Sequence, residues 1–235
     1  MSDLEPVSYS HAGTDLTGRL ARPAGTPRAA VIVFPTIANC NAPVERRARM
    51  LAEQGYLAMV ADFYGEPVTS CEASRPLADR LRADSAHYRG RCSAAIAALR
   101  EIPEAKTLTM LGIGYCMGGQ AVIESARDGQ DLAAVASFHG LLDTTAPAKP
   151  GSIKARILVC HGDADPLVPR EQVVAFWEEM DAAKANWHFH SYSGVRHGFT
   201  DPASDERGVE AIAYNASADR QSWAAMISLF DEVLG

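Results

Sequence analysis

The chain has 235 residues, a net charge of −7 and 47 % hydrophobic residues. This size and balance fit one globular domain over residues 1–235 and exclude a chain that is disordered by composition. Because the charge is negative and Lys and Arg form no dense run, we expect no nucleic acid partner; the basic segment 45–49 fits the solvated face of a helix.

The first elements predicted along the chain form an antiparallel hairpin. Residues 5–10 and 14–20 alternate in polarity, and Ala12-Gly13 between them favours a tight turn. The apolar, β-branched run at 29–34 then predicts a strand buried on both faces. The hydrophobic pattern therefore predicts a half-exposed hairpin first and a buried sheet after it.

Helices and strands alternate from there onward. Helical spacing predicts helices over 43–54, from about 75 to 100, and over 117–127, 170–183 and 214–234. Short apolar runs predict strands over 57–61, 107–113, 132–138, 156–160 and 187–192. This alternation predicts an α/β fold: a mostly parallel central sheet with helices on both faces, preceded by the antiparallel hairpin.

Targeting signals and metal ligands are not evident. The chain begins without a basic segment followed by an apolar one, and no run of 18 apolar residues occurs, so we expect no secretory signal and no membrane contact. The five cysteines are scattered without a Cys-x-x-Cys pair, which is typical of reduced cytosolic proteins. These features predict a cytoplasmic protein without a disulfide framework or a zinc site.

The strongest local signal is Gly-Tyr-Cys-Met-Gly at 114–118, between a predicted strand and a predicted helix. Gly-x-Cys-x-Gly is the nucleophile elbow of α/β-hydrolases with Cys116 in place of serine. The nucleophile of such an elbow sits on a sharp, strained turn, and the flanking glycines, Gly114 and Gly118, leave room for it. The turn also places the thiol at a helix N-terminus, which favours the thiolate.

Two different interpretations of this segment remain open. Gly112-x-Gly114 after a strand also occurs in dinucleotide-binding turns, although Met117 stands where that fingerprint has its third glycine. Alternatively, Cys116 is only a small buried apolar residue. The glycines on both sides favour the elbow over both of these interpretations.

A cysteine at an elbow needs a base and an acid, which follow it in the order nucleophile, acid, histidine. His197 follows one predicted strand, and Asp163 and Asp165 follow another. Loops at the carboxyl ends of parallel strands meet at the ligand crevice. We expect His197 to be the base, and we favour Asp165 over Asp163 because it lies further out on its loop, just before Pro166.

The same crevice should hold the oxyanion donors and the substrate. We expect the backbone N–H groups of Met117 and of Ile37, in the loop after the first buried strand, to form the oxyanion hole. The side chains expected at the substrate lie near other strand ends: Thr36, Tyr64, His139 and Phe199. With these parts the thiolate attacks an acyl carbon, and water then hydrolyses the thioester.

Several segments together resemble the dienelactone hydrolase family, and the resemblance runs over nearly the whole chain from residue 29. They are Gly-Tyr-Cys-Met-Gly-Gly at 114–119, Ala-Glu-Gln-Gly-Tyr at 52–56, Asp-Phe-Tyr-Gly at 62–65, His-Gly-Asp-Ala-Asp at 161–165 and His-Gly-Phe at 197–199. The resemblance implies a single α/β-hydrolase domain without a large lid, a Cys–His–Asp triad, and no metal or organic cofactor.

Two positions depart from the family pattern. The family has a glutamate in the oxyanion loop where this chain has Thr36, so Cys116 is expected to stay paired with His197. The family also has an arginine, which binds the substrate carboxylate, where this chain has Asp201. A carboxylate there repels an anionic substrate, unless another cation compensates: Arg82, Arg89 or Arg207.

The sequence thus predicts a hydrolase of small esters or lactones, with neutral substrates favoured over a carboxylated dienelactone, acting as a monomer or small homo-oligomer. A second hypothesis keeps the thiolate but lets it attack activated phosphotriesters, as a promiscuous activity. A third is that the chain is a non-catalytic relative, and a fourth is a redox protein in which Cys40 resolves an oxidised Cys116.

Overall fold

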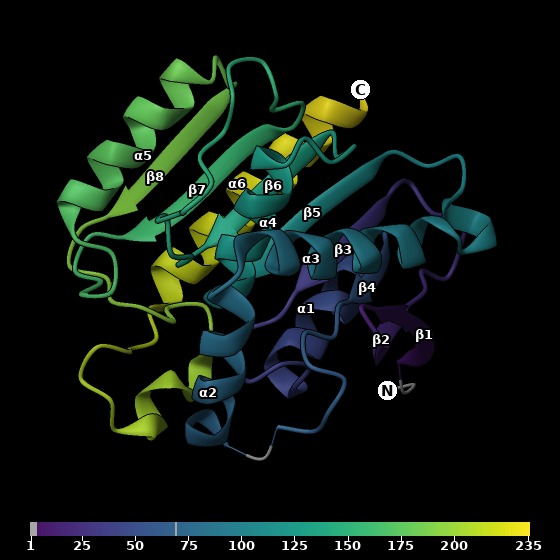
Figure 1. Ribbon diagram of the computed structural model, residues 1–235, viewed down its shortest axis with the longest axis horizontal. Coiled ribbons are helices and arrows are strands. Elements are labelled where there is room, and N and C mark those ends of the chain that lie inside the picture. Colours follow the sequence, from purple (N-terminus) through teal and green to yellow (C-terminus); the bar gives the residue numbers. More distant parts are fainter. Residues whose placement is uncertain (1–3, 69) are drawn as a thin grey trace.

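A computed structural model describes residues 4–68 and 70–235. The strands are β1 (Glu5–His11), β2 (Thr14–Ala21), β3 (Ala30–Phe34), β4 (Leu57–Val60), β5 (Met110–Tyr115), β6 (Ala134–Phe138), β7 (Arg156–Gly162) and β8 (Trp187–Tyr192). They form one eight-stranded sheet in the order β1-β2-β4-β3-β5-β6-β7-β8 (Figure 1). Strands β1, β2 and β4 pair antiparallel and all other neighbours pair parallel, so the predicted fold class is confirmed.

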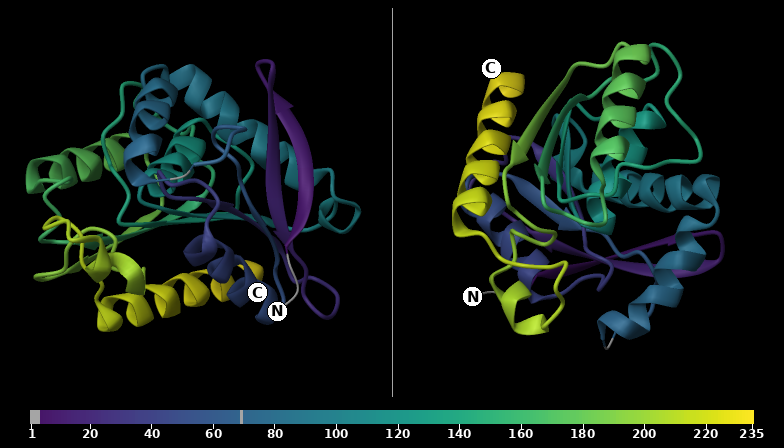
Figure 2. Two further views of the ribbon diagram at one scale, coloured as in Figure 1. Left: turned by 90° about the horizontal axis from the view of Figure 1, so that it is seen from below. Right: turned by 90° about the vertical axis from the view of Figure 1, so that its left-hand side faces the viewer.

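Helices cover both faces of the sheet. They are α1 (Ala42–Glu53), α2 (Cys71–Arg82), α3 (Ser85–Arg100), α4 (Met117–Arg127), α5 (Arg170–Ala182) and α6 (Ala216–Leu234), with 3-10 helices η1 (Pro103–Ala105) and η2 (Pro202–Arg207). Helices α2 to α5 pack on one face, and α1 and α6 pack on the other (Figure 2).

The central strands are buried on both sides, as their apolar runs predict. In β3, Ile32 and Phe34 face the core under α2 to α5, while Val31 and Val33 face the core under α1 and α6. Successive side chains of a strand point to opposite faces, so a continuous apolar run feeds both cores. The parallel arrangement brings the carboxyl ends of β3, β5, β6 and β7 to one edge of the sheet.

The predicted helical stretch that ends at residue 100 is two helices, not one. Helix α2 begins after Ser70, whose hydroxyl accepts the N–H of Ala73 at 3.0 Å. Asp84 separates α2 from α3, and its carboxylate accepts the N–H groups of Ala86 and His87 at 2.9 and 3.0 Å. A side chain that caps the free N–H groups at a helix N-terminus stabilises the start of that helix. The Asp84 cap therefore begins a new helix inside the stretch predicted as one.

The prediction that segment 45–49 is a solvated face is wrong for Arg47. This residue is 4 % exposed, because α1 turns it inward beside Val44 and Ala48. Its guanidinium pairs with Asp219 of α6 and donates to the carbonyl of Thr200 at 2.6 Å. A buried cation needs such partners. Arg47 therefore ties α1 and α6 to the loop that carries His197.

In the described part of the chain, no helix is both long and apolar enough to span a membrane.

Candidate active site

Cys116 sits in the sharp turn between β5 and α4, with φ +55° and ψ −118°. A non-glycine residue in such a conformation stores about 1–3 kcal/mol of strain. The turn leaves no room on either side: a Cβ at Gly114 would lie 1.8 Å from the carbonyl oxygen of Gly118, and one at Gly118 would lie 2.1 Å from that of Phe34. The glycines that predicted the elbow are thus required by its geometry.

His197 and Asp165 form a buried pair beside Cys116. The Nδ1 atom of His197 lies 2.7 Å from Oδ2 of Asp165. Oδ1 of Asp165 accepts the N–H of Leu167 at 2.9 Å, which fixes the carboxylate. Asp163, the rival in the sequence, instead pairs with Arg170 at the surface, at 2.6 Å. Of the two aspartates, Asp165 is therefore the one that orients His197.

The electrostatics favour a thiolate and an imidazolium. Burial alone would raise the pKa of the Cys116 thiol, but the charge of the neighbouring His197 and the N–H groups of Met117 and Ile37 lower this pKa below its usual value. Burial disfavours the charged form of His197, yet the Cys116 thiolate and the Asp165 carboxylate raise the pKa of His197 to about 10. Each group of the pair therefore stabilises the charged form of the other.

The two predicted oxyanion donors lie close enough to Cys116 to lower the pKa of its thiol. The Met117 N–H belongs to the first turn of α4, and the Ile37 N–H belongs to the loop after β3. In that loop the N–H of Asn39 donates to the carbonyl of Thr36 at 2.9 Å, and the Thr36 hydroxyl accepts the N–H of Ala38 at 3.2 Å. Thr36 supplies no carboxylate to compete with His197 for the thiol.

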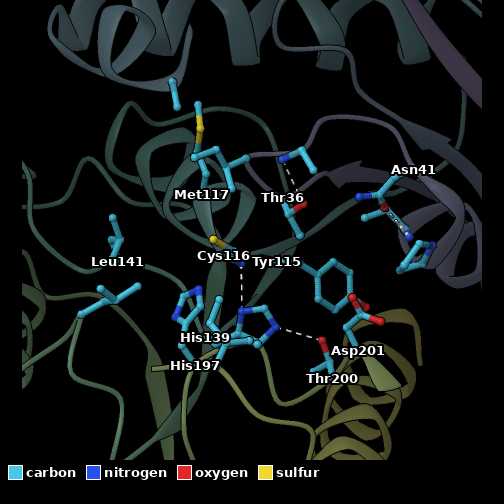
Figure 3. Close-up of a pocket in the computed structure, with 18 of the residues that line it drawn as sticks. Thr36, Asn41, Tyr115, Cys116, Met117, His139, Leu141, His197, Thr200 and Asp201 are labelled. Atoms are coloured by element: carbon cyan, nitrogen blue, oxygen red, sulfur yellow. Dashed lines mark hydrogen bonds between the residues drawn. The ribbon is translucent and has the colours of Figure 1, made fainter. Parts of the chain in front are cut away.

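His139 supports the elbow from β6. Its Nδ1 accepts the N–H of Cys116 at 3.1 Å, and its Nε2 lies 2.9 Å from the hydroxyl of Thr200 (Figure 3). Because Nδ1 accepts, the proton of the ring is on Nε2. Burial and the nearby charges of His197 and Arg47 lower the pKa of His139 well below its usual value, so the ring is neutral. Its ring also packs edge-on against His197, with centroids 5.0 Å apart.

A cavity of about 810 Å³ opens above Cys116 and is lined by His197, Thr36 and His139. Its apolar lining comes mainly from Ile37, Met117, Leu141, Leu167, Val209 and Ile212. Its charged lining comes from Arg47, Arg75, Asp79, Arg82, Asp201 and Arg207. Figure 3 shows Leu141 and Asp201 on opposite sides of the cysteine. The cavity thus combines apolar and charged side chains around the thiol.

Tyr64 and Phe199, both expected at the substrate, do not line this cavity. Phe199 is fully buried and packs edge-on against His139, with centroids 5.3 Å apart. The hydroxyl of Tyr64 donates to the carbonyl of Ile37 at 3.1 Å. Tyr64 and Phe199 therefore support residues that line the cavity and do not line it themselves.

Apart from Arg82, sequence reasoning missed the part of α2 that lines the cavity. Arg75, Ala78, Asp79 and Arg82 lie there at the spacing of one helix face. This spacing was readable, but nothing in the sequence placed α2 over the elbow. Of the three arginines proposed to compensate for Asp201, Arg82 and Arg207 line the cavity. Arg89 does not line it, and its guanidinium pairs with the Glu124 carboxylate at 2.7 Å.

Asp201 and Arg207 form an ion pair on the wall of the cavity. Oδ1 of Asp201 also accepts the N–H of Ala203 at 3.0 Å, where it caps η2. The Asp201 carboxylate is thereby held in place with its charge compensated, and the Arg207 guanidinium is already occupied.

Cys40 is not brought to Cys116. Its thiol lies 3.7 Å from the carboxylate of Glu45, and it packs with the core under α1 and α6, whereas Cys116 packs with the opposite core. Burial, with the Glu45 charge, raises the pKa of Cys40 to about 12. This environment does not suit a resolving thiol, which must be reactive and adjacent.

The fold and the elbow define an α/β-hydrolase with a cysteine at the nucleophile position. The family model described as "Dienelactone hydrolase family" matches residues 16–234. The chain belongs to the dienelactone hydrolase family, which confirms the resemblance seen in the sequence and replaces the interpretation of a dinucleotide-binding turn.

Known relatives agree with this assignment. A crystal structure described as a dienelactone hydrolase-like promiscuous phosphotriesterase from metagenomic libraries is 34 % identical, with a TM-score of 0.93 and 100 % of each chain covered. A probable 2-oxo-3-(5-oxofuran-2-ylidene)propanoate lactonase from Bradyrhizobium sp. is 28 % identical over 92 % of this chain and 89 % of the relative. A putative carboxymethylenebutenolidase from Synechocystis is 26 % identical over 97 % and 96 %, respectively. The protein is therefore a dienelactone hydrolase-like hydrolase.

Proposed function

We propose that the protein hydrolyses small neutral esters or lactones through Cys116, His197 and Asp165. The observation that carries this proposal is a cysteine on a strained elbow beside a histidine held by a buried carboxylate, with two backbone N–H groups that lower the pKa of the same thiol. A nucleophile, a base with its orienting acid and an oxyanion site are the three parts that acyl transfer requires. All of them come from one chain, so the proposal holds for a monomer and for a small homo-oligomer.

The proposed reaction has two halves. The Cys116 thiolate adds to the acyl carbon, and the N–H groups of Ile37 and Met117 stabilise the oxyanion. The intermediate collapses to a thioester as the leaving oxygen takes the proton of His197. Water then gives a proton to His197 and adds to the thioester, and the acid leaves as Cys116 regains its resting form. Asp165 stabilises the imidazolium throughout.

Ion pairs on two of the arginines that line the cavity support a neutral substrate. Arg207 is paired with Asp201, and Arg47 is paired with Asp219, so neither guanidinium is free for a substrate carboxylate. Arg82 donates to the amide oxygen of Gln120 at 2.7 Å. The apolar side chains of the lining and the cavity volume of about 810 Å³ suit a substrate larger than a small lactone acid. We therefore place a carboxylated dienelactone below neutral esters as a substrate.

Activated phosphotriesters are the second candidate substrate class. The relative described as a promiscuous phosphotriesterase is 34 % identical over the whole chain, and this favours the extension. In this reaction the thiolate of Cys116 attacks phosphorus and expels an aryloxide, and the S–P bond must then be hydrolysed by water. The oxyanion donors would face the phosphoryl oxygen in place of the carbonyl oxygen.

The test compares wild type with Cys116→Ala and Cys116→Ser on aryl esters and aryl phosphotriesters. We expect Cys116→Ala to lose both activities by about three orders of magnitude or more. Cys40→Ala is the matched control, with unchanged activity. Full activity of Cys116→Ala overturns the proposal. An electrophilic probe that fails to label Cys116 in preference to the other cysteines supports a non-catalytic relative instead.

A further inference from the structure

The Asp-Phe-Tyr-Gly segment at 62–65 has no part in the proposed reaction. It follows β4, and among the residues described around the cavity none belongs to it. Two of its side chains nevertheless reach across to the loop that carries Ile37. These contacts, from Asp62 and Tyr64, bear on the aim of the Ile37 N–H group.

Tyr64 holds Ile37 from behind. Its hydroxyl donates to the carbonyl of Ile37 at 3.1 Å and lies 3.5 Å from Sδ of Met117, so it touches both residues that carry oxyanion donors. Tyr64 is 8 % exposed, and burial raises its pKa far above the usual value, so the hydroxyl keeps its proton and remains a donor. The bond fixes the peptide plane on the carboxyl side of Ile37.

Asn39 fixes the other peptide plane. The carbonyl of Thr36 and the N–H of Ile37 belong to one planar trans peptide, so they point in opposite directions. The backbone N–H of Asn39 donates to that carbonyl at 2.9 Å. This hydrogen bond fixes the direction of the Ile37 N–H, which is one of the groups that lower the pKa of the Cys116 thiol. It requires Asn39 in the left-handed region, with φ +59°.

Asp62 locks Asn39 in that conformation. Oδ1 of Asp62 accepts the side-chain amide of Asn39 at 2.8 Å, and the amide oxygen of Asn39 accepts the N–H of Phe63 at 2.9 Å. Both Asp62 and Asn39 are buried, at 7 % exposure each. A buried, reciprocal pair of hydrogen bonds leaves the Asn39 side chain one orientation.

A purely structural role explains only part of this network. The carboxylate of Asp62 also accepts the N–H groups of Thr17, Tyr64 and Gly65 at 2.9 to 3.0 Å, and these bonds stabilise its own turn and the neighbouring hairpin. These three hydrogen bonds stabilise the turn and the hairpin without any contribution from Asn39 or Ile37. The bonds that cross to the loop of residues 36–39 are the ones that need another explanation.

We propose that Asp62 and Tyr64 are positioning residues that preorganise the Ile37 N–H group for the oxyanion. This inference rests on the proposed function, because it assigns a role within the same acyl transfer. Donors aimed in advance stabilise a developing oxyanion without reorganisation in the transition state. Loss of either link lets the turn at 36–39 rotate, and the ground state then contains misdirected N–H groups.

The test measures two reactions of the same thiol. Acylation by an aryl ester builds an oxyanion, whereas alkylation by iodoacetamide, measured where Cys116 is fully ionised, builds none. For Tyr64→Phe we expect the rate of single-turnover acylation to fall about tenfold, which is a smaller loss than removal of a whole oxyanion donor causes. The rate of alkylation should stay within about twofold of wild type. Tyr56→Phe, at another buried tyrosine on the α6 side of the sheet, is the matched control and leaves both rates unchanged.

Asn39→Gly provides a second, independent variant. Glycine adopts the left-handed conformation freely, so the turn is retained while the link to Asp62 is lost. We expect the same selective loss of acylation. Equal losses of acylation and alkylation, or acylation within about twofold of wild type in both variants, overturn the inference. If wild type itself shows no acylation that depends on Cys116, the proposed function fails instead.

Discussion

His139 accepts the backbone N–H of Cys116, and this bond helps to hold the strained elbow in place. His139 itself has φ +41°, in the left-handed region. The bond shares the N–H with the carbonyl of Phe138, which lies 3.0 Å from the same nitrogen. A neutral histidine is therefore built into the elbow as an acceptor, next to the imidazolium of His197.

This relationship predicts different outcomes for two substitutions at residue 139. Asparagine tolerates the left-handed region and offers an acceptor, so His139→Asn should retain most ester hydrolysis. Leucine offers no acceptor and strains the backbone, so His139→Leu should lose about 10- to 100-fold in acylation and about 1–3 kcal/mol of unfolding free energy. Kinetics and denaturant unfolding measure both. Equal behaviour of the two variants contradicts the role of the acceptor.

The pH dependence follows from the shifts of the pair. The lowered pKa of Cys116 predicts that alkylation by iodoacetamide begins below the usual pH for a thiol, and that ester hydrolysis rises with it. Hydrolysis should fall again near pH 10, where His197 loses its proton and no longer protonates the leaving group. In His197→Gln, only the N–H groups of Met117 and Ile37 counteract the effect of burial on the pKa of the Cys116 thiol. The pH midpoint of alkylation should therefore rise. A midpoint unchanged by that substitution would show that the two groups are not coupled.

The two aspartates of segment 161–165 offer a matched pair of variants. Asp165→Asn removes the carboxylate that holds His197 and should lower kcat by about 10²- to 10⁴-fold. Asp163→Asn breaks a surface pair with Arg170 and should leave kcat within about twofold. Both variants are assayed on one aryl ester. The assignment of the acid is wrong if Asp163→Asn is the more damaging change.

The elbow could be read from the sequence because its requirements are local. Gly114, Cys116 and Gly118 lie within one turn, and the strand and helix around them follow from simple periodicity. The fold could be read for the same reason, since alternating buried strands and helices predict a covered parallel sheet. Asp165 could be ranked above Asp163 only by its place in the loop.

Interactions between distant segments could not be read in the same way. Arg47 is separated from Asp219 by most of the chain, and nothing near it marks it as buried. The directions of Tyr64 and Phe199 depend on how loops pack, so the prediction placed them near the site without separating a lining side chain from a supporting one. The Asn39–Asp62 bond likewise depends on two loops meeting.

The pair of Asp201 and Arg207 predicts how substrate charge is selected. The Asp201 carboxylate occupies the guanidinium of Arg207 on the cavity wall, as a substrate carboxylate otherwise would. Asp201→Asn keeps the shape and an acceptor for the N–H of Ala203, but it frees the Arg207 charge. We expect KM for an ester with an anionic acyl group to fall about 3- to 10-fold, while KM for its neutral isostere stays within about twofold. Asp79→Asn, which also removes one negative charge from the cavity wall but lies on α2, separates a general change of charge from release of Arg207. Equal effects of the two variants on the anionic ester would mean that the net charge of the cavity, and not the ion pair, sets the preference.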